Sequence, residues 1–210
     1  MSGHDSKVKA NHLEIEQSCM KDYEDLNEKE LRIHLAASYR LVEEFGWSFL
    51  IFGHLTARVP GPNKHFLINP YGLMYDEVTA SNLVKIDLEG NIIDQTNWDV
   101  NPAGFIIHSA VHSSKTDAHC VMHTHTNAGM AMAGLKKGLI NIDFSGSAYY
   151  KKIAYHDFEG VTIRKDECKR IANNLGNKSI MILKNHGLLT TGSTVAEAFL
   201  KLYTLESACK

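Results

Sequence analysis

Residues 118–125 read Ala-His-Cys-Val-Met-His-Thr-His, and the rest of the chain can be organised around them. Their apolar and β-branched residues predict a buried strand. The small residues of 127–136 predict a helix directly after it. A buried strand followed by a helix favours a sheet covered by helices.

The chain before this stretch contains further predicted elements. A helical pattern starts at Asn27 and stops near Gly46, and Pro102 begins a second helix that runs to about Ser114. Between them we expect strands at 47–59 and 65–69 and a hairpin of 83–87 with 91–94.

The chain after this stretch alternates strands and helices. We expect strands at 151–156, 160–163, 179–184 and 187–191, and helices at 166–175 and 194–209. Thr194 and Glu197 match a capping box. This order predicts a mixed α/β fold with one domain at 27–210, preceded by a flexible polar arm at 1–26.

Composition excludes several classes of protein. The 210 residues are 44% hydrophobic and 22% charged, as in an ordinary globular chain. Lys and Arg number 22 against 24 Asp and Glu, which disfavours nucleic acid as a partner. No apolar run approaches the ~20 residues that span a membrane, so we expect a cytoplasmic protein. Four widely spaced cysteines exclude a zinc knuckle.

The twelve histidines are the chemical signal. Alternate residues of a strand share a face, so His123 and His125 can converge on one ion. His186 ends an apolar strand before Gly187 and is either a third ligand or a solvated loop residue. His108 and His112 share a helical face and form a rival pair. Chance spacing, with every ring hydrogen-bonded in a plain core, is the remaining alternative.

Several blocks in order resemble the class II aldolase/adducin family, nearest its adducin-head subgroup. The resemblance covers roughly 27–209. The blocks are Phe45-Gly46-Trp47-Ser48, Gly53-His54-Leu55-Thr56-Ala57-Arg58-Val59, 69–79 (NPYGLMYDEVT), Asn101-Pro102-Ala103-Gly104-Phe105, 121–125 (VMHTH), Ala154-Tyr155-His156-Asp157 and Asn185-His186-Gly187-Leu188.

The resemblance implies a three-layer α/β/α fold with a mainly antiparallel central sheet. It also implies that His123, His125 and His186 bind Zn²⁺ or another divalent metal. Family enzymes act on small carbonyl or carboxylate substrates and are commonly tetramers, so a homo-oligomer is expected.

The sequence departs from the family's sugar-phosphate aldolases where their acid/base Glu and phosphate-binding serines stand. Counting back from His123 puts Gly104 at the Glu position and Pro102 and Ala103 at the serines. His54 replaces the Asn of the usual Gly-Asn-x-Ser element. The candidates to replace the missing acid are His54, Tyr75 and Tyr149.

Two functional hypotheses follow. One is a metal-dependent lyase that performs aldol cleavage or decarboxylation on a small, non-phosphorylated oxygenated substrate. The other is a non-catalytic adducin-head-like module for oligomerisation or partner binding that keeps the metal site.

Overall fold

A seven-stranded sheet forms the centre of the molecule, in the order β3-β2-β1-β4-β7-β6-β5. The computed structural model describes residues 21–140, 142–160 and 166–210. All neighbouring strands are antiparallel except β5 and β6, so the predicted mixed, mainly antiparallel sheet is confirmed. The strands are β1 His54–Arg58, β2 Phe66–Ile68, β3 Val84–Ile86, β4 Cys120–Thr124, β5 Ile153–His156, β6 Ile180–Leu183 and β7 Gly187–Gly192.

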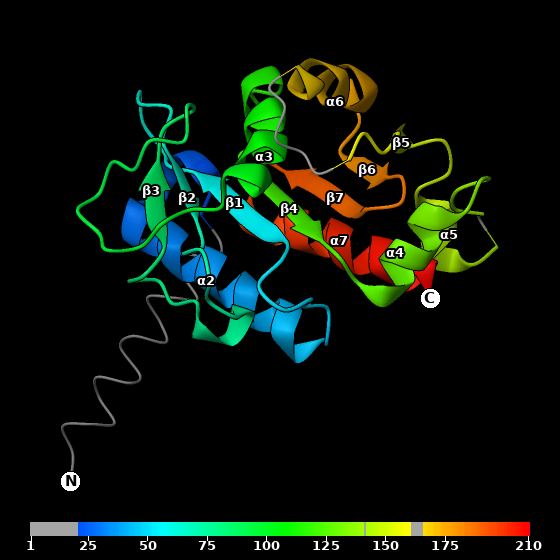
Figure 1. Cartoon of the computed structure of the whole chain (residues 1–210), viewed down its shortest axis with the longest axis horizontal. Helices are drawn as coiled ribbons and strands as arrows, with labels where there is room; N and C mark the ends of the chain where they lie inside the picture. The colour runs from blue at the N-terminus through cyan, green and yellow to red at the C-terminus, as the bar shows by residue number, and fades with distance from the viewer. Residues whose placement is uncertain (1–20, 141, 161–165) are drawn as a thin grey trace, which may run out of the picture.

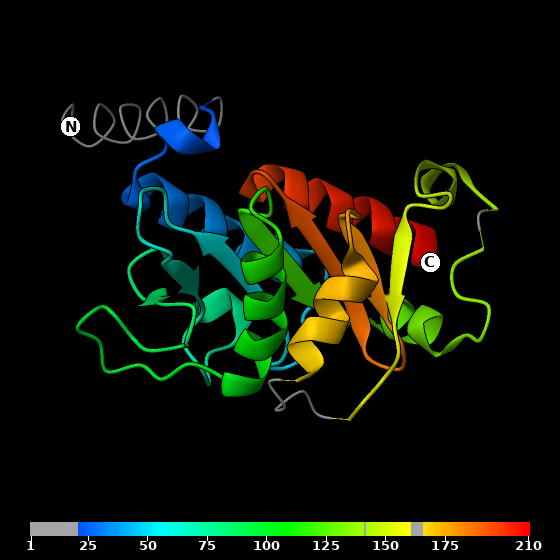
Figure 2. The same cartoon turned by 90° about the horizontal axis from the view of Figure 1, so that it is seen from above.

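Helices cover both faces of this sheet and complete the three layers. Figures 1 and 2 show α3 and α6 on one face and α2 and α7 on the other, with α4 and α5 near α7. The helices are α2 Glu28–Glu44, α3 Pro102–Ser114, α4 Asn127–Gly134, α5 Phe144–Ala148, α6 Glu167–Leu175 and α7 Val195–Cys209, with 3-10 turns η1 Tyr23–Asp25 and η2 Tyr75–Glu77. No helix of the described residues is long and apolar enough to cross a bilayer.

Alternation along β4 decides which residues face which layer. Val121 packs in the core cluster with Ile107 of α3 and Ile171 of α6. Met122 belongs to the cluster on the opposite face, with α2 and α7. His123, two residues after Val121, therefore faces the α3 layer.

The predicted strand at 47–59 is wrong in its first half. The strand begins only at His54, and an isolated bridge between Phe49 and Phe52 makes a turn before it. Leu50 and Gly53 have positive φ values of 52° and 90°, which break the extended backbone. A Cβ at Gly53 would lie 3.0 Å from the carbonyl oxygen of His123, so glycine lets the loop approach β4 closely.

Several smaller expectations also have outcomes. Residues 1–20 of the predicted arm and 161–163 of the predicted strand 160–163 lie outside the described residues; within 21–26, Tyr23 and Leu26 are buried. The α5 helix was not predicted. Only half of the predicted capping box forms: Thr194 accepts from the Glu197 amide at 3.1 Å, while the Glu197 carboxylate accepts from Ser193.

The hydroxyl of Tyr39 fixes β1 to α2. Tyr39 is fully buried. Its oxygen accepts from the Leu55 amide at 2.8 Å and lies 2.7 Å from the Leu55 carbonyl and 2.9 Å from Asn69 Oδ1. Strand β1, which carries His54, is thus tied to α2, on the sheet face opposite the α3 layer.

Replacing Tyr39 by Phe should lower the free energy of unfolding by about 1–3 kcal/mol, because the buried Leu55 amide loses its partner. Urea denaturation followed by circular dichroism measures the change. Tyr203→Phe is the matched control, since Tyr203 is 43% exposed, and its effect should stay within about 0.5 kcal/mol. Equal effects of the two substitutions would contradict the role given to Tyr39.

Candidate metal centre

The end of β4 and the turn between β6 and β7 bring three histidines together. His123 lies in β4, His125 lies one residue beyond its end, and His186 lies in the turn. The ring centroids are 4.5, 4.7 and 4.8 Å apart. One ring nitrogen from each lies within 4.8 Å of the other two, so the set proposed from the sequence converges in space.

The turn that carries His186 depends on a left-handed backbone at Asn185 and on a close approach of side chains at Gly187. Asn185 has a φ of 53°, a left-handed conformation that Asn adopts more readily than most residues. A Cβ at Gly187 would lie 3.0 Å from Cδ2 of His125 and 3.2 Å from Cε1 of His123. Glycine at 187 therefore leaves the space that the two rings occupy.

The tautomer of His123 fits a metal ligand. Its Nδ1 donates to the carbonyl oxygen of Leu188 at 2.8 Å, which leaves Nε2 without a proton in the neutral ring. That Nε2 lies 2.7 Å from Nε2 of His125. Two bare lone pairs repel at this distance, so a proton or a cation must lie between them. Metal-binding histidines commonly donate their other ring nitrogen to a carbonyl in this way, and the residues present fit a divalent ion.

Burial keeps the three rings neutral. Loss of solvation lowers the pKa of His123 well below its usual range, and the neighbouring imidazoles add to this. Burial and the neighbouring His186 lower the pKa of His125 to about 4, and burial and the neighbouring His156 lower the pKa of His186. Neutral imidazole is the form that binds metal, so all three nitrogens are available as ligands at neutral pH.

The histidines line a cavity of about 530 Å³. Much of its wall is apolar, and the described part of the lining contains no Lys, Arg, Asp or Glu. The apolar wall residues are Phe52, Tyr71, Ile107, Met130 and Phe158.

His54 fills the place where a side chain at position 104 would lie. Gly104 is in α3, and a Cβ built on it would overlap Cε1, Nε2 and Cδ2 of the His54 ring. Both residues line the cavity. The departures at positions 54 and 104, which the sequence shows separately, are therefore one linked change.

The structure does not bring Tyr75 or Tyr149 to this cavity. The Tyr75 hydroxyl donates to the carbonyl oxygen of Phe52 at 3.2 Å, and its ring is buried in the cluster that faces α2. The Tyr149 hydroxyl donates to the carbonyl oxygen of Lys201 in α7 at 3.0 Å. Of the three acid candidates, only His54 lines the cavity.

The rival pair His108 and His112 is explained by hydrogen bonds within the core. Oγ1 of Thr56 lies 2.7 Å from Nδ1 of His108 and 2.8 Å from Nε2 of His112. Both rings are buried on α3. Among the described residues, neither belongs to a group that could hold an ion.

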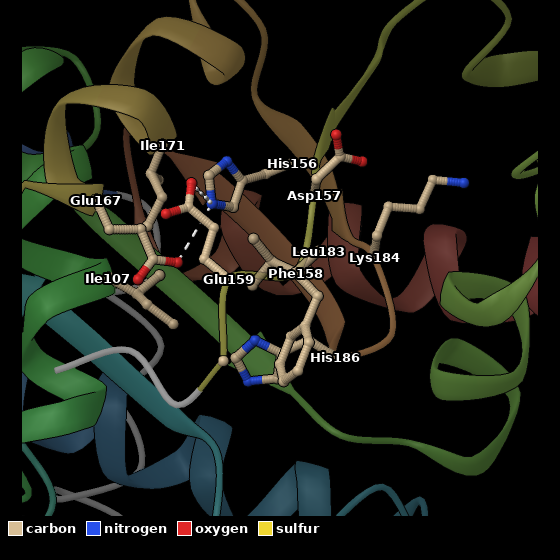
Figure 3. A pocket seen from close by; sticks show the side chains of 11 residues that line it. Ile107, His156, Asp157, Phe158, Glu159, Glu167, Ile171, Leu183, Lys184 and His186 are labelled. Carbon is tan, nitrogen blue, oxygen red and sulfur yellow. Dashed lines mark hydrogen bonds and ion pairs between the residues drawn. The ribbon is translucent and has the colours of Figure 1, made fainter. Parts of the chain in front are cut away.

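A second buried polar pair was not predicted. Nε2 of His156 lies 3.3 Å from Oε1 of Glu167, and its Nδ1 is 2.8 Å from the side-chain amide of Asn174. Figure 3 shows the carboxylates of Glu159 and Glu167 pointing toward His156, while His186 and Phe158 lie below them. The sequence signal was weak, because Glu167 lies eleven positions after His156 and marks only the first turn of a helix.

A family model described as "Class II Aldolase and Adducin N-terminal domain" matches residues 33–210. The chain belongs to this family. The resemblance drawn from the sequence blocks is confirmed, and the histidine cluster described above lies within the matched region.

Individual relatives include both enzymes and adducins. Alpha-adducin of Rattus norvegicus is 48% identical over 189 residues, which are 89% of this chain and 26% of adducin. The crystal structure of an aldolase II superfamily protein from Pseudomonas syringae has a TM-score of 0.86 at 48% identity, covering 87% of this chain and 74% of that one. L-fuculose 1-phosphate aldolase from Glaciozyma antarctica has a TM-score of 0.78 at 33% identity, covering 87% and 71%.

Gly104→Ala should displace the His54 ring and lower the free energy of unfolding by about 1–3 kcal/mol, because the added methyl group overlaps a buried imidazole. A crystal structure of the variant would show the ring position, and urea denaturation would give the energy. Gly134→Ala in α4 is the control: its Cβ meets only Asn185 Oδ1, at 3.9 Å, and helix propensity favours Ala. An unmoved His54 ring in Gly104→Ala would show that a side chain at position 104 and the His54 ring can occupy the site together.

The metal-free protein should lose stability steeply in mild acid. Burial lowers the pKa of four buried histidines: His54 and His112 to about 3, and His108 and His123 well below the usual value. The unfolded chain binds protons from about pH 6.5 downward while the folded chain does not. The contribution of the neutral rings to the free energy of unfolding is therefore fully present above this pH. It falls toward pH 3, by up to about 1.4 kcal/mol per pH unit for each ring.

Urea unfolding at pH 7.5, 6.5 and 5.5 measures this proton uptake. His34→Gln serves as a comparison, because His34 is only partly buried and its pKa is also lowered; this variant should remove at most one proton from the slope. A stability that stays constant between pH 7.5 and 5.5 would show that the rings take up protons in the folded protein as readily as in the unfolded chain.

Proposed function

We propose that the chain is a divalent-metal-dependent lyase that breaks a carbon–carbon bond in a small, non-phosphorylated, oxygenated substrate. The observation that carries the proposal is the convergence of His123, His125 and His186 on one side of a large cavity. Three imidazoles with an open side are the ligand pattern of catalytic zinc sites, so Zn²⁺ is the first metal to test.

A divalent ion bound there would polarise a carbonyl or carboxylate oxygen of the substrate and stabilise the negative charge left when the bond breaks. The chain's own residues prepare this site. The Leu188 carbonyl holds His123 in the ligand tautomer. Phe52, Tyr71 and Phe158 give the cavity an apolar wall that displaces water from the substrate.

The reaction class is aldol cleavage or decarboxylation. Gly104 has no side chain to act as the acid or base that the family's sugar-phosphate aldolases place there. His54, whose ring fills that space and lines the cavity, is positioned to replace it. In aldol cleavage a hydroxyl proton leaves as the bond breaks, and His54 is placed to accept it.

The composition of the cavity wall supports a substrate without phosphate. Phosphate sites use Arg, Lys or several backbone amides. The described lining contains neither cation, and it presents aromatic and aliphatic carbon instead. A small hydroxy or oxo compound with two metal-binding oxygens fits this chemistry.

A second candidate is an adducin-head-like interaction module. Its support is the 48% identity to alpha-adducin, of which this chain covers 26%. Large apolar side chains are also exposed near α5, with Ile142 at 87% and Phe144 at 92% exposure. These exposed residues suit a contact between copies of the chain. A homo-oligomer, which the family resemblance suggests is a tetramer, therefore stays a prediction. The cytoplasmic location also stays a prediction.

Protein purified without chelator should contain one divalent ion per chain by elemental analysis. His123→Ala and His186→Ala should each lose it, because two remaining imidazoles bind an ion far more weakly than three. The same preparations are then tested for turnover on a panel of carbonyl compounds and 2-oxo acids. Activity of the wild type should be lost in both variants.

His65→Ala provides the control, since His65 lies before β2 and outside the cavity; it should keep both metal and turnover. Wild-type protein without any bound divalent ion would overturn the metal centre. Bound metal without turnover on any member of the panel would favour the interaction module instead.

A further inference from the structure

A chain of buried hydrogen bonds runs between β1 and α3, behind the cavity that the three histidines line, which we call the metal cavity. Nδ1 of His112 lies 2.9 Å from the carbonyl oxygen of Ala118. The other nitrogen of His112 contacts Oγ1 of Thr56, which in turn contacts Nδ1 of His108. His108 and Thr56 have no exposed surface and His112 has 3%, so water does not compete for these bonds.

The direction of each bond follows from the first one. A carbonyl oxygen only accepts, so His112 carries its proton on Nδ1 and its Nε2 is bare. Thr56 must therefore donate its single hydroxyl proton to Nε2 of His112. The Thr56 oxygen can then only accept from His108, which places the His108 proton on Nδ1 and leaves Nε2 of His108 bare.

Among the described residues, the buried histidine nitrogens without a hydrogen-bond partner are Nε2 of His108 and Nδ1 of His54. The two rings are 6.0 Å apart between centroids and nearly perpendicular, at 73°. An unpaired buried polar atom is costly, by about 1–3 kcal/mol. A proton on Nδ1 of His54 supplies the donor that the bare Nε2 of His108 lacks, and a direct hydrogen bond between these two nitrogens would pair both atoms.

This assignment fixes the other end of the His54 ring. Cε1, Nε2 and Cδ2 form the end that lies against Gly104, and both residues line the metal cavity. If Nδ1 carries the proton of the neutral ring, Nε2 is bare and can only accept. A cavity ligand that reaches this nitrogen must therefore bring a donor.

We propose that Thr56, His108 and His112 form a buried relay that holds His54 in the tautomer with a bare Nε2, which accepts a hydrogen bond from a hydroxyl group of the cavity ligand. Thr56, His108 and His112 are positioning residues, since they act only through His54. The choice of a hydroxyl-bearing ligand rests on the proposed function, whereas the relay itself does not depend on a metal.

The first test measures the tautomer in metal-free protein at pH 7.5. Long-range proton–nitrogen NMR of histidine labelled with ¹⁵N separates protonated from bare ring nitrogens, and His54→Gln identifies the His54 signals by their loss. We expect Nδ1 of His54 to be protonated and Nε2 to be bare. A proton on Nε2 of His54 in the folded wild-type protein would overturn the proposal.

Two substitutions of Thr56 then separate the relay from simple packing. Thr56→Val removes the hydroxyl at nearly constant shape, and the His54 nitrogens should shift toward a mixture of tautomers. Thr56→Ser keeps the hydroxyl and should keep the wild-type signals. Unchanged His54 signals in Thr56→Val would contradict the relay, and equal changes in both variants would reduce Thr56 to a packing residue.

The second test uses zinc-loaded protein and two probes in calorimetry. Glycolate has a hydroxyl donor, and methoxyacetate has the same oxygen without the proton. Wild type and Thr56→Ser should bind glycolate roughly ten-fold more tightly, and Thr56→Val should lose most of this preference. Equal affinities in the wild type would overturn hydroxyl recognition. Binding of neither probe would count against the proposed metal chemistry, while the tautomer measurement still decides the relay.

Discussion

The antiparallel pairing of β4 with both of its neighbours is the constraint on which the site depends. On one side the pairing places His54 opposite His123, and on the other it places Leu188 opposite Thr124. The same register brings the Leu188 carbonyl to Nδ1 of His123 and the β6–β7 turn beside His125. A shift of one residue would turn the histidine of β4 toward the opposite layer.

The cavity lined by the three histidines therefore depends on two kinds of interaction that have separate origins. Ligand convergence comes from strand pairing and from glycine at 187, which leaves room for the rings. The shape of the cavity comes from α3, where glycine at 104 admits the imidazole of His54. By the resemblance, the first arrangement matches the ligand set expected of the family, whereas positions 54 and 104 depart from the expected acid–base position, so the proposed difference lies in acid–base chemistry and ligand shape.

Much of this could be predicted from sequence, because it depends on local patterns. The α3 helix has the predicted bounds, and the two-residue spacing of His123 and His125 favoured a metal site, to which the family resemblance added His186. Other features depend on contacts between distant segments. The turn before His54, the link between positions 54 and 104, and the pair His156 and Glu167 leave no periodic trace, since their partners lie far apart in the chain.

The carbonyl of Leu188 has a consequence for the time at which the site can form. It lies 65 positions after the ring that it orients, and His186 is nearly as distant. A growing polypeptide therefore exposes the first two imidazoles long before the third ligand and the orienting oxygen exist. Tight capture of the proposed ion would have to wait until β7 has been synthesised and has paired, so metal occupancy would report completion of the sheet.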